Sequence, residues 1–166
     1  MKKQLYRIVT GILAVAWMCL IFSFSNQPAT ESSKVSGGLC HRMVERVNDT
    51  FHLDMTEKQQ LDMAEKIEYP VRKAAHMTEY AILGLLSFAF YCGILKKEMR
   101  QFLAALLTAA VYAATDEFHQ YFIPGRSAEV RDVCIDTLGA FIGLAILFFT
   151  LKVARKHCQK PKLTLQ

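Results

Sequence analysis

Charge is missing from four long stretches of this 166-residue chain. They run over residues 8–25, 80–95, 101–115 and 137–151, and they hold 18, 16, 15 and 15 residues. These stretches also mostly lack the polar stripe at 3.6-residue spacing that a helix on the surface of a soluble protein shows. Because clusters of polar residues separate them, the pattern predicts four transmembrane helices in a single domain.

Paired cysteines and several familiar catalytic motifs are also missing. The five cysteines form an odd set with no CxxC spacing, so the sequence gives no indication of a zinc or redox site. Cys40 is the one cysteine expected clearly outside the spans, and alone it forms no intrachain disulfide. No HExxH, Walker or GxSxG motif occurs. We therefore expect no bound metal and no cofactor.

Basic residues are unevenly distributed between the segments that join the spans. If the N-terminus is inside, the inner segments hold eleven Lys and Arg, Lys160 and Lys162 among them, against one acid, for a net charge of +10. The remaining residues hold nine Lys and Arg against fourteen acids, for a net charge of −5. The positive-inside rule then predicts that both termini are cytoplasmic. The basic character is thus attributed to topology, and no nucleic-acid partner is expected.

The first 25 residues combine a basic start with a long apolar run, which is also the pattern of a signal peptide. The run is longer than the usual 7–15-residue core, and no small-x-small cleavage site follows it. We therefore expect an uncleaved first span over about residues 7–25, with Pro28 stopping the helix.

The segment of about residues 26–70 is predicted to lie outside and to contain short helices. Thr56-x-x-Gln59 has the pattern of a capping box, which predicts a helix from there to about Glu68. A second helix is expected from about residue 32 to residue 50. Its apolar face would lie on the membrane surface or cap the bundle, and a surface helical loop is favoured over a lid on a substrate. That face holds Val35, Leu39, Met43, Val44 and Val47.

The three remaining spans are expected at about residues 72–95, 101–121 and 132–151. Pro70 suits the first helical position of the second span. The turn over residues 96–100 is short, so the second and third spans should be antiparallel neighbours. The predicted fold is therefore all-α, a four-transmembrane-helix bundle with short extracytoplasmic helices between the first and second spans.

Polar side chains gather at the predicted outer ends of all four spans. Ionisable groups at membrane depth are costly, so such a convergence indicates a functional site. Arg72, His76 and Glu79 follow i, i+4, i+7 spacing and share one helix face. Asp132 and Asp136 share a face with Gly139 and Gly143, a small-residue packing surface, so they should point into the bundle. The full candidate set is Ser25, Gln27, Arg72, Lys73, His76, Glu79, Asp116, Glu117, His119, Gln120, Arg126, Arg131, Asp132 and Asp136.

Two groups of this set receive different roles. His119 is expected to act as a base and Asp116, three residues earlier, to orient its ring. Glu117, His76 and Glu79 complete the catalytic candidates. Arginines such as Arg72 and Arg126 suit phosphate or carboxylate. The binding candidates are Arg72, Lys73, Gln120, Arg126, Arg131, Asp132, Asp136, Ser25 and Gln27.

Other interpretations of the same residues stay open. The charges would equally form an ion-pair network that holds four helices together. His76-x-x-Glu79 and Asp116-x-x-His119 resemble the carboxylate and histidine pairs of di-metal helical bundles, one of them reversed. A transporter is disfavoured, since the chain shows no inverted repeat.

Four motifs, in order over nearly the whole chain, resemble the VanZ-like membrane proteins. They are Phe22-x-x-Ser25-x-Gln27; Arg72-Lys73-x-x-His76-x-x-Glu79-Tyr80; Asp116-Glu117-x-His119-Gln120 with Phe122-x-Pro124-Gly125-Arg126; and Asp132-Val133 with Asp136-Thr137-x-Gly139-Ala140-x-x-Gly143. Position 136 is often Asn in that family, and Asp stands here. The family is named for an accessory gene of bacterial glycopeptide resistance, linked to reduced teicoplanin susceptibility.

The resemblance implies a multi-pass protein of the bacterial cytoplasmic membrane and a role in the cell envelope. Membrane lipids are the expected partners. The first function hypothesis is an enzyme acting on an envelope lipid or its phosphate or acyl headgroup. The alternative is a non-catalytic module that binds a lipid-linked envelope precursor or a lipoglycopeptide.

Overall fold

A computed structural model describes residues 1–158 and contains five helices in this range. They are α1 (Lys2–Ser25), α2 (Ala29–Phe51), α3 (Glu57–Cys92), α4 (Glu98–Gln120) and α5 (Val130–Cys158). The predicted all-α class is confirmed. Lys160 and Lys162, which entered the charge asymmetry, lie outside the described residues.

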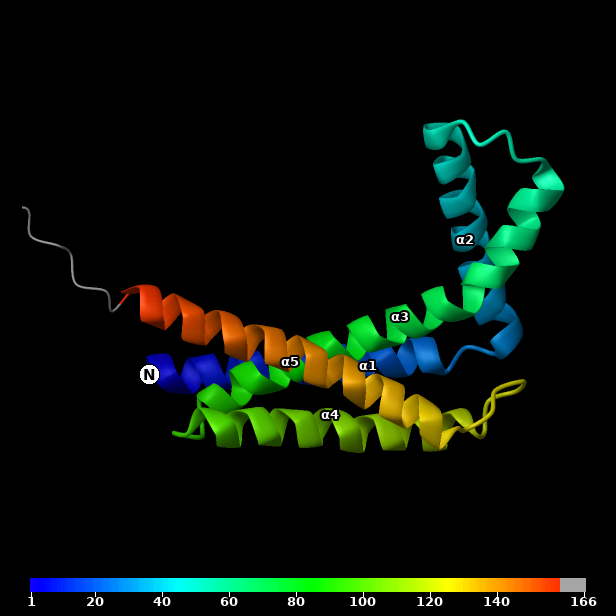
Figure 1. Cartoon of the computed structure of the whole chain (residues 1–166). Helices are drawn as coiled ribbons and strands as arrows, with labels where there is room; N and C mark the ends of the chain where they lie inside the picture. The colour runs from blue at the N-terminus through cyan, green and yellow to red at the C-terminus, as the bar shows by residue number, and fades with distance from the viewer. Residues whose placement is uncertain (159–166) are drawn as a thin grey trace, which may run out of the picture.

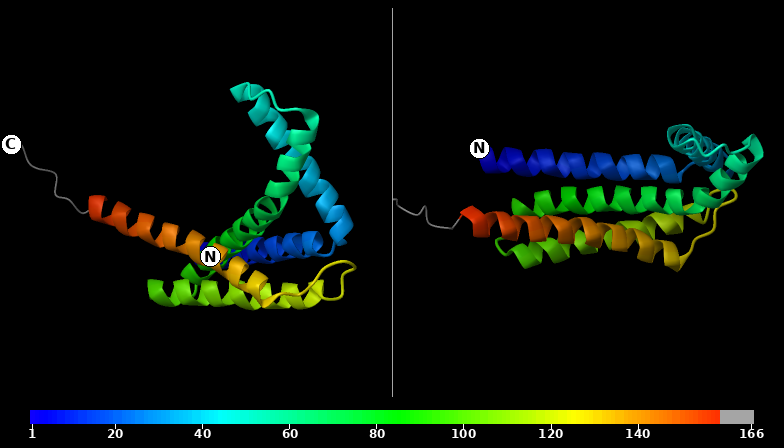
Figure 2. Two further views of the ribbon diagram at one scale, coloured as in Figure 1. Left: turned by 45° about the vertical axis from the view of Figure 1, so that its right-hand side comes forward. Right: turned by 45° about the horizontal axis from the view of Figure 1, so that its top comes forward.

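The helices form a bundle with a hairpin at one end (Figure 1). The bundle consists of α1, the second part of α3, α4 and α5, which run alongside one another (Figure 2). The hairpin consists of α2 and the first part of α3, and it extends across the direction of the bundle helices. We call the end of the bundle that carries this hairpin the hairpin end.

Two helices are long and apolar enough to cross a membrane. They are α1, with a mean hydropathy of 2.2, and residues Val130–Lys156 of α5, with a mean hydropathy of 2.1. In α3 and α4 the charge-free stretches are shorter, and charged or polar residues occupy the rest of each helix. Length and composition therefore support two candidate membrane helices.

The predicted helix boundary at Pro70 is wrong. α3 continues through Pro70 from Glu57 to Cys92, so the expected short helix and the expected second span are parts of one helix. Proline has no N–H and its ring crowds the preceding turn, which bends a helix without always ending it. Figure 1 shows α3 changing direction between the hairpin and the bundle. The predicted start is confirmed: Thr56 and Gln59 form the capping box.

Small residues bring α3 and α5 close together within the bundle. A Cβ added to Gly139 would overlap the backbone carbonyl of Met77, and one added to Gly143 would lie 2.9 Å from Ala81 Cβ. The expected packing role of Gly139 and Gly143 is confirmed. We call this contact the α3–α5 seam. It orients α5 so that the side chains of the turns before Gly139 also meet α3.

The hairpin has a small core of its own. Cys40 and Val44 of α2 are buried against Ala64 of α3. Of the apolar face predicted for this helix, only Val44 is buried here. The other four members, Val35, Leu39, Met43 and Val47, are exposed. The prediction identified the helix correctly, but the face that packs is rotated from the predicted one.

Candidate functional site

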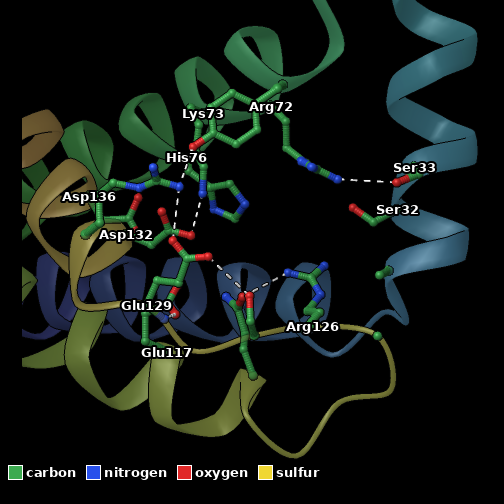
Figure 3. Close-up of a pocket in the computed structure, with 16 residues that line it drawn as sticks. Ser32, Ser33, Arg72, Lys73, His76, Glu117, Arg126, Glu129, Asp132 and Asp136 are labelled. Atoms are coloured by element: carbon green, nitrogen blue, oxygen red, sulfur yellow. Dashed lines mark hydrogen bonds and ion pairs between the residues drawn. The ribbon is translucent and has the colours of Figure 1, made fainter. Parts of the chain in front are cut away.

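A polar cavity of about 280 Å³ lies at the hairpin end of the bundle. Figure 3 shows side chains from α3, α5, the end of α4 and the following loop converging on it, opposite the start of α2. Nine of the fourteen predicted site residues line this polar cavity. They are Arg72, Lys73, His76, Glu117, Gln120, Arg126, Arg131, Asp132 and Asp136.

Two more predicted residues, Ser25 and Asp116, do not line the cavity but belong to a buried hydrogen-bond network with Gln120, which does. Ser25 Oγ donates a 2.7 Å hydrogen bond to Asp116 Oδ2, and Gln120 Nε2 donates a second, 2.9 Å long, to the same oxygen. All three residues are buried. The network joins the end of α1 to the end of α4, and it holds the Gln120 amide with its oxygen free to reach Arg126.

Arg126 is fixed by neutral groups alone. Its Nε donates to the Gln27 carbonyl at 3.0 Å, and Nη2 donates to the Phe24 carbonyl at 3.3 Å. Its Nη1 donates to Gln120 Oε1 at 3.1 Å. In the described part of the chain no carboxylate lies within ion-pairing distance of this guanidinium. Arg126 is one of the residues predicted to bind an anion, and its position agrees with that hypothesis.

The surroundings of Arg126 have two opposite effects on its pKa. Burial lowers the pKa of Arg126 from its ordinary value, and the neighbouring Asp116 carboxylate raises it again. A guanidinium has an ordinary pKa above 12, so the side chain remains a cation at neutral pH. The cavity therefore contains a positioned positive charge whose protein partners are two carbonyls and one amide.

The other cations of the cavity have acidic or hydroxyl partners. Lys73 pairs with Asp132 across α3 and α5. Arg131 lies 3.0 Å from Glu129 and also donates to the Tyr69 hydroxyl at 2.9 Å. Arg72 donates to Ser33 Oγ of α2 at 3.3 Å. These contacts tie the hairpin, α3 and α5 to one another around the cavity.

Several buried polar atoms near the cavity have no hydrogen-bond partner among the described residues. His76 Nδ1 and Glu79 Oε2 face each other at 3.7 Å, too far for a hydrogen bond. Asp132 Oδ1 is likewise unpartnered. Native proteins satisfy nearly all such groups, so a concentration of exceptions at one place indicates a site with a function besides packing.

The expected pairing of His119 with Asp116 does not form. The Asp116 carboxylate is occupied by Ser25 and Gln120, as described above. His119 Nε2 lies 3.3 Å from Asn26 Oδ1, and its ring packs on Phe22 at 4.4 Å between centroids. His119 does not line the polar cavity. The imidazole that does line it is His76.

The remaining predicted residues lie at the margin of the cavity. Glu79 is one turn further along α3 than His76, and Gln27 contributes its backbone carbonyl to Arg126. Within residues 1–158 no group of three or more His, Cys, Asp or Glu side chains is arranged to hold a metal ion. The di-metal interpretation of the two spaced pairs therefore gains no support.

Sequence reasoning missed five polar lining residues: Ser32, Ser33, Tyr69, Ser127 and Glu129. Ser32 and Ser33 reach the cavity because α2 starts beside the loop after α4, where the Ala29 N–H donates to the Pro124 carbonyl at 3.3 Å. Glu129 is placed by its backbone N–H, which donates to Glu117 at 3.0 Å. These placements depend on contacts between distant segments, for which the local sequence carries no signal.

Comparison with known proteins gives a family but no close relative. No curated protein and no solved structure matches the chain. The VanZ/LLP1 family matches residues 10–152, a range that includes every residue of the candidate site. The chain therefore belongs to the VanZ/LLP1 family.

Proposed function

We propose that this chain is an integral membrane protein of the bacterial cell envelope with both termini in the cytoplasm. Its four spans would be about residues 7–25, 72–95, 101–121 and 132–151. The +10 charge that the sequence gives the predicted inner segments supports this orientation. The side-by-side arrangement of α1, the second part of α3, α4 and α5 supports the span count (Figure 2). In this orientation the polar cavity lies at the outer face.

We further propose that the polar cavity binds the anionic headgroup of an envelope lipid. The observation that carries this proposal is Arg126, a cation fixed by three neutral acceptors. Arg126 is half-buried, and charges that are partly removed from water are usually paired, because desolvation without a partner is unfavourable. A phosphate or carboxylate in the cavity would supply the missing negative partner, and a guanidinium binds either through parallel hydrogen bonds.

The size of the polar cavity limits the range of ligands that it can enclose. About 280 Å³ is near the lower end of the range for small-molecule sites. It suits a phosphate with a small substituent and is too small to enclose a whole lipoglycopeptide. The geometry thus favours a lipid headgroup over the drug itself as the occupant.

A catalytic form of this proposal is supported by His76. Its ring lines the cavity, its Nδ1 has no hydrogen-bond partner among the described residues, and Glu79 lies 3.7 Å away. An imidazole with a nearby carboxylate is suited to proton transfer once a ligand brings the two closer. In this form Arg126 binds the anion, His76 exchanges the proton and Glu79 orients the ring. His119 and Asp116 have no part in that step.

The test measures binding of glycerol 3-phosphate to the full chain in phosphatidylcholine nanodiscs. Arg126→Gln should weaken binding about tenfold or more, because charge-assisted hydrogen bonds to the anion are lost. The control is Arg42→Gln. Arg42 is an exposed arginine of α2 that does not line the polar cavity. Binding by Arg126→Gln at the strength of the unmodified chain would contradict the proposal.

A further inference from the structure

A second hollow adjoins the polar cavity on the side of α1. It has a volume of about 240 Å³ and lies between the end of α1, the start of α2 and the part of α3 that follows Pro70. We call it the side groove. Four residues line both hollows: Ser32, Arg72, His76 and Arg126. The two hollows therefore meet at Arg126, the cation to which the headgroup is assigned.

The side groove has a more apolar lining than the polar cavity has. Beyond the shared residues its walls are formed mainly by apolar side chains of three helices. These are Phe24, Val35, Leu39, Val71 and Ala75. Phe24 is 46% exposed and Val35 is 69% exposed, so the apolar part is open to the surroundings. Large exposed apolar surfaces of this kind normally have an apolar partner.

The open side of the groove lies on the flank of the bundle. Phe24 belongs to α1, a helix apolar enough to cross a membrane, and it is the last residue but one of that helix. On α2, the exposed apolar residues of the groove continue into Met43 and Val47. Figure 1 shows α2 running across the bundle direction at this level. Under the proposed topology, an apolar chain in the side groove would therefore extend from the protein into the bilayer near the outer edge of the hydrocarbon core, where α1 ends.

We propose that the side groove holds the hydrocarbon chain of the lipid whose phosphate binds at Arg126. This inference rests on the proposed headgroup function. It adds the chemical class of the ligand and the path by which the ligand enters the site. The ligand is an amphiphile with a phosphate in the polar cavity and an acyl chain in the side groove. It reaches the site sideways from the outer leaflet, and the exposed apolar face of α2 lies on that leaflet.

The experiment compares two probes with the same phosphate group, one with a chain and one without. The probes are oleoyl lysophosphatidic acid and glycerol 3-phosphate, each titrated into the full chain in phosphatidylcholine nanodiscs. Ala75→Trp places a large side chain in the groove. Ala74→Trp is the control, since Ala74 is also exposed on α3 but lines neither hollow.

Ala75→Trp should lower affinity for lysophosphatidic acid at least tenfold and leave affinity for glycerol 3-phosphate within twofold. Ala74→Trp should bind both probes as the unmodified chain does. Because partitioning of the lipid into the disc is the same for both variants, the comparison isolates the groove. Equal lysophosphatidic acid affinities for the two tryptophan variants would overturn the groove assignment.

A second measurement needs no variant. Phosphatidic acid with a photoreactive diazirine in its acyl chain should crosslink to peptides that contain Leu39 or Val71. Crosslinks confined to other surfaces of the bundle would overturn the proposal. If glycerol 3-phosphate binds and depends on Arg126 while the chain adds no affinity, only this inference fails. If binding of neither probe depends on Arg126, the headgroup function fails.

Discussion

The helices α3 and α5 meet in two adjacent places that are built in opposite ways. In the α3–α5 seam, Gly139 and Gly143 let the backbones approach so closely that one added carbon would overlap α3. One to two turns nearer the hairpin end, Lys73, His76, Asp132 and Asp136 of the same helices surround a cavity of about 280 Å³. One contact is filled and apolar, and the other is hollow and charged.

The contrast indicates what each place contributes. Close packing of small residues is the usual way in which helices associate in a membrane, so the seam accounts for how the two helices stay together. The polar cavity leaves buried atoms such as Asp132 Oδ1 without partners, although the seam demonstrates that this pair of helices can pack fully. Proteins retain such unfavourable local arrangements mainly where function requires them. The contrast therefore favours the α3–α5 seam as the stabilising contact and the polar cavity as the place of the proposed ligand site.

The largest effect is expected when volume is added to the seam. Gly139→Leu should reduce the yield of folded, monodisperse protein more than tenfold, because the side chain would overlap the α3 backbone at Met77. Size-exclusion chromatography in detergent measures the yield.

The matched control for this change is Gly38→Leu. A Cβ at Gly38 meets nothing within 4 Å, and leucine is a better helix former than glycine, so this variant should accumulate normally. If Gly139→Leu accumulates as well as Gly38→Leu does, the seam is not the stabilising contact and the comparison breaks down.

A smaller effect is expected from breaking the ion pair at the edge of the cavity. Asp132→Ala should lower the free energy of unfolding by about 1–3 kcal/mol, because Lys73 is left partly buried without its partner. The control is Glu31→Ala, which breaks the exposed pair with Lys34 and should change stability by less than about 0.5 kcal/mol. Urea denaturation in detergent compares the two. Equal changes in the free energy of unfolding would mean that partial burial does not make the Lys73–Asp132 pair more important for stability than an exposed pair.

The smallest effect is expected at His119. His119→Gln should leave both stability and activity near those of the unmodified chain, since the ring lies outside the cavity against Asn26 and Phe22. His76→Gln should also fold. Under the catalytic form of the proposal it should remove any change in teicoplanin susceptibility that expression of the chain produces, because glutamine carries no proton at neutral pH. Immunoblotting of membranes verifies accumulation. A His76→Gln protein with full activity would remove the catalytic form of the proposal and leave headgroup binding in place.

Sequence reasoning was most successful where structure depends on neighbours along one helix. The charge-free runs located the bundle helices, and the capping box at Thr56 and the packing role of Gly139 were predicted correctly. The Asp116–His119 pair failed because the two side chains meet different groups: Asp116 accepts from Ser25, 91 positions away, whereas the His119 ring packs against Phe22 and lies beside Asn26. Spacing shows which side chains share a face, but the helix that this face meets is decided by tertiary packing.

The bend of α3 at Pro70 has a mechanical consequence. Proline removes one hydrogen bond from a 36-residue helix, so bending stiffness is lowest at that point. Ser33 of the hairpin lies on one side of this compliant point, and Arg72, its partner across the polar cavity, lies just beyond it on the other. Any tilt of the hairpin about Pro70 therefore changes the distance between these two side chains. The width of the polar cavity is thus coupled to the angle between the hairpin and the bundle. Under the proposed topology, the apolar side of this hairpin lies on the lipid surface.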